Sequence, residues 1–143
     1  MSEDMPRAVI FLHGGNRYAL PLFAVRRVTE MGLVARVPRA PPALLGVMNQ
    51  QGRVACLVDL GPLVGLKARP ARPEGKVVML QRQRGEVGLY VSEVAGIEDL
   101  TGEAEELAEP LGAAHSQVQA ADGPVKLIDP EHLQRAIDNL GEA

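Results

Sequence analysis

The side chains most capable of chemistry in this sequence are three histidines and one cysteine, and they are widely separated. His13, His115 and His132 lie far apart along the chain, and none has metal-ligand spacing to Cys56. We therefore expect each histidine to lie at the surface or in a turn. Cys56 stands among apolar residues of a predicted strand, where an inert buried thiol is expected rather than a nucleophile.

Motifs for phosphate or cation binding are also missing from the sequence. It contains neither a G-x-S-x-G motif nor a Walker A motif. Gly14-Gly15 lacks the strand–loop–helix context of a phosphate site and is interpreted as a hairpin turn. The acidic residues between Glu103 and Glu109 lack the Asp, Asn and Gly chemistry of a Ca²⁺ loop, which favours a solvated face. We predict a protein that is not an enzyme and has no metal and no cofactor.

The composition indicates one globular domain of ordinary type. The chain has 143 residues, of which 46% are apolar and 23% charged. No apolar run approaches the roughly 18 residues of a membrane span. A single cysteine excludes an internal disulfide, and no secretory signal is recognisable, so we expect a cytoplasmic protein. Aromatic residues make up only 3%, which argues against a nucleic-acid reader built on base stacking.

The charge is distributed unevenly along the chain. Residues 1–72 hold ten Lys/Arg and four Asp/Glu, a net charge of +6, whereas residues 73–143 hold five and fourteen, a net charge of −9. Two interpretations remain open. The split arises by chance together with an acidic loop, or it marks two surfaces of opposite sign that serve different partners or each other.

Short apolar runs separated by turn signals predict a succession of strands. The segment at 98–109 is acidic and is predicted to be turn-like. Asp59 is predicted to cap a short turn. A helix is predicted to begin at Pro130, after the Asp129 cap, and to end near Asn139. Leu22, Val25 and Val28 recur at a spacing of three, which suits a short helical turn. The predicted hairpins pair 9–12 with 18–20, 47–49 with 54–58, 77–80 with 87–91, and 117–119 with 125–128.

An internal repeat relates the two halves of the chain. A shift of 69 residues aligns Val9 with Val78, Leu20 with Leu89, Val25 with Val94, and Val28 with Ile97, and a shift of 70 aligns Asp59 with Asp129. We interpret the repeat as two small β-barrels packed together. The expected organisation is a tail (1–7), one domain (8–139) with halves at about 8–66 and 76–139 joined by a linker at 67–75, and a second tail (140–143).

The residues that follow the first hairpin resemble a known family. Tyr18-Ala19-Leu20-Pro21, Val37-Pro38 and the stretch from Pro41-Pro42 through Gly46-Val47, Asn49 and Gly52 to Asp59-Leu60 are similar to the bacterial chemotaxis coupling-protein (CheW-like) family. Val77-Val78, Val91 and the closing Leu127-Ile128-Asp129 extend the resemblance over nearly the whole chain.

This resemblance implies an all-β fold of two five-stranded SH3-like barrels around a groove, with a short C-terminal helix. It implies a non-catalytic adaptor, monomeric when alone, that binds the cytoplasmic tip of a chemoreceptor (a methyl-accepting chemotaxis protein) and the regulatory domain of a CheA-type histidine kinase. Leu22, Val25 and Val94 are the receptor-groove candidates that it implies.

The sequence departs from the family pattern at the candidate kinase or array contact. The family's usual Asn-Leu-Arg-Gly turn reads Asn49-Gln50-Gln51-Gly52 here, followed by Arg53, and Arg27 stands where members commonly have a glutamate. In the family these acidic and basic positions can pair. The usual strand-end Asp of the second half is Ser92. These changes predict a divergent accessory member with weakened kinase contact.

The hypothesis is therefore a chemosensory scaffold that binds a receptor within an array and modulates its coupling to a kinase. Alternatives are a full coupling protein that bridges receptor and kinase, a detached kinase regulatory domain of the same fold, and a small-ligand-binding or enzymatic barrel protein. The sequence names no receptor or stimulus, and it leaves open whether the opposite charges of the halves drive self-association.

Overall fold

The computed structural model describes residues 7–140 as an assembly of short strands with three short helices. The strands are β1 (Arg7–His13), β2 (Asn16–Pro21), β3 (Val25–Glu30), β4 (Val34–Ala35), β5 (Leu44–Gln50), β6 (Arg53–Asp59), β7 (Lys76–Leu80), β8 (Val87–Val91), β9 (Glu93–Asp99), β10 (Thr101–Leu111), β11 (Ala114–Ala120) and β12 (Gly123–Ile128). The helices are the 3₁₀ turn η1 (Leu22–Ala24), α1 (Leu60–Leu63) and α2 (Pro130–Asn139). The predicted all-β class with a short C-terminal helix is confirmed.

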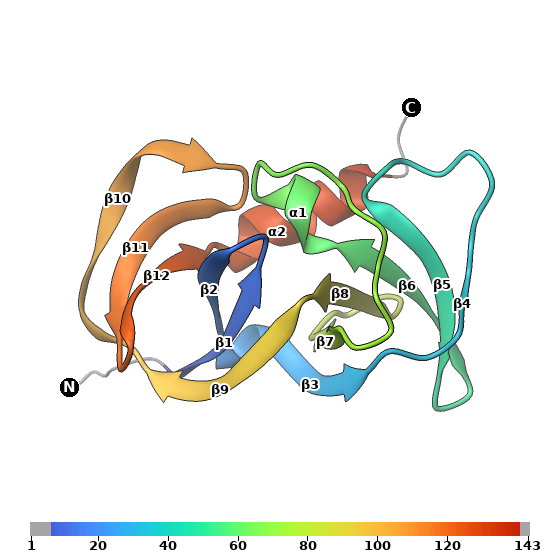
Figure 1. The fold of residues 1–143 in the computed structure, drawn as a ribbon, viewed down its shortest axis with the longest axis horizontal. Coiled ribbons are helices and arrows are strands. Elements are labelled where there is room, and N and C mark those ends of the chain that lie inside the picture. Colours follow the sequence, from blue (N-terminus) through green and yellow to red (C-terminus); the bar gives the residue numbers. More distant parts are fainter. Residues whose placement is uncertain (1–6, 141–143) are drawn as a thin grey trace.

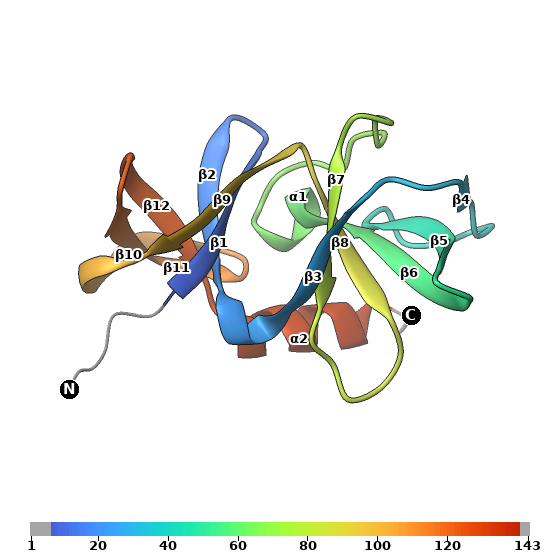
Figure 2. The same cartoon turned by 90° about the horizontal axis from the view of Figure 1, so that it is seen from below.

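Two sheets lie side by side along the long axis of the molecule, and α2 lies across the junction between them (Figures 1 and 2). Sheet A has the strand order β10-β11-β12-β2-β1-β9, and sheet B has the order β3-β7-β8-β6-β5-β4. Each sheet has six strands where the resemblance implied five. The edge strands β10 and β4 occupy corresponding places in the two sheets.

Each sheet takes strands from both halves of the repeat. The hairpin β1–β2 joins sheet A, and the chain then crosses through η1 to place β3–β6 in sheet B. The second half repeats the exchange, because β7–β8 join sheet B and β9–β12 return to sheet A. The parallel pairs β12–β2 and β6–β8 close the sheets in the same way. Neither half therefore completes a sheet by itself.

Strands β1 and β7 carry apolar residues at consecutive positions because the core covers both faces of each strand. On β1, Val9 and Phe11 belong to the largest cluster, which draws on both sheets and α2, whereas Ala8 and Ile10 belong to a smaller cluster within sheet A. On β7, the repeat mate Val78 lies in the same shared cluster. A strand buried on both faces carries apolar residues at consecutive positions. The predicted hairpins and the repeat of buried residues are thus present in the fold.

The acidic segment is the element that the sequence pattern predicted wrongly. Residues 98–109, expected to be turn-like, form the end of β9 and most of the edge strand β10. Pairing with β11 imposes the extended conformation, although the residues of β10 are almost all exposed and poor in β-branched side chains. Of the predicted tails, residues 1–6 and 141–143 lie outside the described residues. No helix within residues 7–140 is long and apolar enough to cross a membrane.

Candidate partner-binding surfaces

The receptor-groove candidates lie on η1 and on the two strands that cross between the sheets. Leu22 lies in η1, Val25 begins β3 and Val94 lies on β9, and all three are half-buried against the shared core cluster. β3 and β9 run along the same side of the molecule, the side that faces the reader in Figure 2. We call this side the β3/β9 face.

The spacing of three between Leu22, Val25 and Val28 does not come from the helical turn that the sequence suggested. Only Leu22–Ala24 form a 3₁₀ turn. The pairing of β3 with β7 skips Arg26, and the pairing of β9 with β1 skips Ala95, the residue that aligns with Arg26 in the repeat. An extra residue in a strand reverses the alternation of side chains beyond it. Val25 and Val28 therefore share one side of β3, as Val94 and Ile97 do on β9.

Three exposed apolar residues, on η1, β3 and β9, were not selected from the sequence as site residues. Val28 is 40% exposed, and its repeat mate Ile97 is 54% exposed. Phe23, 76% exposed, borders a hollow of about 340 Å³ that also contacts the start of α2. The repeat alignment paired Val28 with Ile97, and that signal could have found them. Phe23 carries no such signal, because its exposure depends on how η1 lies against α2.

The kinase and array candidates form a second cluster around the turn between β5 and β6. Gln51 and Gly52 both have positive φ angles (53° and 84°), and the backbone N–H of Gly52 donates to the Asn49 side chain at 2.9 Å. This arrangement is a two-residue hairpin turn with an exposed tip. Arg27 donates to the side-chain oxygen of Gln50 at 3.0 Å. Gln50, not Gln51, is thus the neighbour of Arg27 within one molecule.

Arg27 is a donor with incomplete partners. Its Nε is buried and has no hydrogen-bond partner among the described residues. Arg53, at the other end of the same cluster, lies 3.8 Å from Glu86, which also accepts from Arg26 at 2.6 Å. The cluster therefore presents basic and amide groups.

His13 is the last residue of strand β1 and is buried, so the prediction that it lies at the surface or in a turn was wrong. Its Nε2 is 2.9 Å from Oδ1 of the buried Asp59, and Ser92 Oγ lies 3.3 Å from its Nδ1. Because β1 belongs to sheet A and β6 to sheet B, this contact links the two sheets. Burial by itself would raise the pKa of Asp59. Hydrogen bonds from His13 and from the N–H groups of Gly61 and Arg69 outweigh burial and lower that pKa.

His115 and His132 lie far apart in the sequence but meet in the structure, and both are half-buried. His115 Nε2 is 2.7 Å from His132 Nδ1, and His115 Nδ1 is 3.6 Å from Oδ2 of Asp129. The residues described here contain no group of three or more His, Cys, Asp or Glu arranged to hold a metal ion. Cys56 lies in the middle of β6, as predicted, and is half-buried.

Comparison with known proteins decides the family. A family model described as CheW-like domain matches residues 7–137. The chain belongs to the CheW-like family. The crystal structure of the scaffolding protein TtCheW from Thermoanaerobacter tengcongensis superimposes with a TM-score of 0.74 over 90% of this chain and 86% of that chain, at 17% identity. That likeness supports the two-barrel fold.

Two of the three relatives by sequence described here are named as chemotaxis proteins. The probable chemotaxis protein CheW of Rhizobium etli is 30% identical over 97 residues, which cover 66% of this chain and 61% of that protein. The chemotaxis protein CheW of Helicobacter pylori is 26% identical over 90 residues (63% and 54%), and the protein PilI of Pseudomonas aeruginosa 28% over 88 residues (62% and 49%). The chain spans about three-fifths or less of the length of these relatives.

Proposed function

We propose that this CheW-like chain is a non-catalytic chemosensory adaptor. It binds the cytoplasmic tip of a chemoreceptor through the β3/β9 face, within the cytoplasmic receptor array, and modulates the coupling of that receptor to a CheA-type histidine kinase. Membership of the CheW-like family supports the scaffold role. The observation that carries the receptor site is the repeated exposure of Val28 and Ile97 on the two crossing strands.

Apolar side chains on the β3/β9 face are unfavourable in water, and this cost favours a partner that covers them. Val28 and Ile97 are large apolar residues on solvent-facing parts of β3 and β9, next to the half-buried Val25 and Val94. An apolar face of this kind favours a partner that also presents apolar side chains, such as an amphipathic helix. The receptor tip, a coiled coil, meets this requirement.

Charge at the turn between β5 and β6 supports a weakened kinase contact. Where family members commonly carry a glutamate, this chain has Arg27, a donor held by Gln50. A kinase surface adapted to an acidic residue presents donors or positive charge, which Arg27 repels. The neutral Gln51 at the exposed turn tip also lacks the positive charge of the family's arginine. We infer that the chain binds receptor while it couples poorly to the kinase.

A binding assay with a receptor cytoplasmic fragment tests the β3/β9 face. Val28→Glu and Ile97→Glu should each weaken receptor binding at least ten-fold, because a charge in an apolar contact must be desolvated. Both residues are exposed, so the melting temperature should change little. Val54→Glu provides a matched control, since Val54 is 70% exposed but lies on β6. Unchanged receptor binding by both variants would exclude this face.

A further inference from the structure

A groove of about 970 Å³ lies at the outer end of sheet B. One wall is the connector from β3 to β5, which includes β4, and the other wall is the segment at 68–73 that precedes β7. Met31, Val34 and Leu45 in the lining are half-buried and pack against the apolar cluster inside sheet B. Small-molecule sites are mostly apolar clefts of roughly 300–1,000 Å³. The groove therefore has the size and the apolar floor of a site for one small molecule.

Four arginines lie along the two walls of this groove. Arg36 and Arg39 belong to the connector. Arg69 and Arg72 belong to the opposite wall, and all four side chains are exposed. The lining contains no Asp or Glu, and none of the four guanidinium groups makes a hydrogen bond or an ion pair with another residue that the structure describes. The groove therefore carries four positive charges that are free to bind an added anion.

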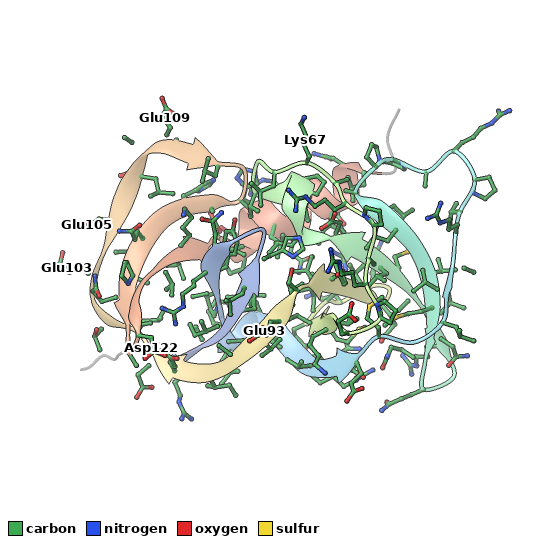
Figure 3. All side chains as sticks on the ribbon, viewed as in Figure 1. Lys67, Glu93, Glu103, Glu105, Glu109 and Asp122 are labelled. Carbon is green, nitrogen blue, oxygen red and sulfur yellow. The ribbon has the colours of Figure 1, made fainter. Side chains whose placement is uncertain are left out.

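The acidic residues of the molecule lie outside the groove. Glu103, Glu105 and Glu109 lie along β10 in sheet A, away from sheet B (Figure 3). Glu30 and Glu74 are next to the two walls in the sequence, but neither is in the lining. The chain has a net charge of −3, so the positive charge is a local property of the groove and not of the whole molecule. A cleft lined by charges of one sign attracts ligands of the opposite sign.

The segment at 68–73 holds its arginines on a fixed backbone. The N–H of Arg69 donates to Oδ2 of Asp59 at 3.1 Å, and the N–H of Arg72 donates to the hydroxyl of Tyr90 at 2.9 Å. Asp59 and Tyr90 are both buried and belong to strands of sheet B. The backbone of this wall is thus anchored to the sheet at both arginines, while their side chains stay exposed.

The opposite wall holds Arg39 in an uncommon backbone conformation. Its φ angle is 61°, in a turn where the N–H of Ala40 donates to the carbonyl of Val37 at 3.3 Å. A positive φ is uncommon for residues other than glycine, and such outliers cluster at active sites and ligand clamps. Pro38 and Pro41 stiffen this part of the wall, because the proline ring fixes φ. A site with preset walls loses less conformational entropy when a ligand binds.

We propose that this arginine groove binds a small organic anion in which an apolar body carries at least two phosphate or carboxylate groups. The apolar body covers the floor of the groove, and each wall binds one anionic group. Arginine suits this role because its planar guanidinium group donates two parallel hydrogen bonds to a phosphate or carboxylate. An uncharged ligand would leave the guanidinium groups without acceptors, and an inorganic anion would leave the floor in water. This site does not depend on receptor or kinase binding.

Fluorescence titration of the chain with bis-ANS, an apolar dye that carries two sulfonate groups, tests this site. Wild type should bind the dye, with an affinity that falls when salt is raised from about 0.05 M to about 0.5 M. Arg36→Gln/Arg69→Gln, which removes one charge from each wall, should weaken binding about ten-fold or more. Arg7→Gln/Arg84→Gln, which removes the same charge at exposed sites outside the groove, should bind like wild type. Because all four side chains are exposed, both double variants should keep the melting temperature of wild type.

Two competitors separate the charged part of the ligand from the apolar part. Inorganic triphosphate has the charges without the apolar body, and uncharged anilinonaphthalene has the rings without the charges. Each should displace bis-ANS only at a concentration about ten-fold or more above that of the dye. Absence of dye binding, equal affinity in the groove variant, or an equal loss in the control variant would overturn the proposal. Displacement by either competitor at the concentration of the dye would also overturn it, because charge alone or apolar contact alone would then suffice.

Discussion

Asp59 and Asp129 occupy matching places in the two halves of the repeat, yet their surroundings differ. Each stands at the end of a strand and caps the next helix, since Asp59 accepts from the N–H of Gly61 at 2.9 Å and Asp129 from that of Glu131 at 3.0 Å. Asp59 is buried and bonded to His13 of the other sheet. Asp129 stays half-exposed and begins α2, which is ten residues long.

The difference shows how one local motif acquired two structural roles. Asp59 caps a helix, α1, of only four residues. The main contribution of Asp59 is therefore the link between β6 and His13 at the junction of the sheets. The cap on α2 begins a helix whose Leu133 and Ile137 pack into the shared core. The first Asp holds the barrels together directly, and the second does so by positioning a helix. Variants at the two sites test this distinction.

Replacement of Asp59 should have the largest effect on stability. Asp59→Ala leaves His13 and the Gly61 N–H buried without their acceptor, and the partly buried Arg69 N–H also loses its acceptor. We expect a loss of about 3–4 kcal/mol in the free energy of unfolding. Chemical denaturation followed by circular dichroism measures it. A loss below about 1 kcal/mol, the usual cost of a helix cap alone, would show that the link between the sheets contributes nothing.

Acid should remove part of the same stabilisation. The folded-state pKa of Asp59 is lowered, so its contribution is complete above the unfolded-state pKa of about 4 and is lost as the pH falls through the folded-state value. The unfolding free energy of wild type should therefore decrease below about pH 4. Subtracting the profile of Asp59→Asn from that of wild type isolates this carboxylate. A difference that stays constant down to pH 2 would contradict the assignment.

Replacement of Asp129 should have a smaller effect. Asp129→Ala removes the side-chain acceptor at the start of α2 but leaves Pro130 at the first helical position. The expected loss is about 1 kcal/mol. The same denaturation experiment measures it, and Asp129→Ser, which can still cap, should recover most of the loss. An effect as large as that of Asp59→Ala would erase the contrast between the two halves.

Local signals predicted much of the fold. Turn glycines, apolar runs and the Asp129-Pro130 cap located the hairpins, and α2 runs from Pro130 to Asn139 as expected. The repeat aligned Val9 with Val78, and the structure buries both in one shared core cluster. These features depend on residues close together in the sequence or on the repeat between the two halves. Both can be recognised in a single sequence.

Features decided by contacts distant in sequence could not be predicted in this way. His13 is buried because Asp59, 46 positions away, meets it across the junction of the sheets. The exchange of hairpins between the sheets leaves no trace in the repeat itself. At the candidate kinase contact, the register of β5 with β6 places Gln51 at the turn tip and leaves Gln50 beside Arg27. The family resemblance suggests these positions as a contact, but it does not indicate which of them pair within one molecule.

Affinity for an isolated kinase regulatory domain tests most directly whether this chain binds receptor but couples poorly to the kinase. Titration monitored by fluorescence anisotropy should show weak binding by wild type. Arg27→Glu/Gln51→Arg should bind at least ten-fold more tightly, because a wrong-sign group at a charge-paired contact costs several kcal/mol by order of magnitude. Receptor-fragment binding should be the same for both proteins. Kinase binding by wild type as tight as that of a standard coupling protein, with no gain in the double variant, would contradict the account and identify the chain as a full coupling protein.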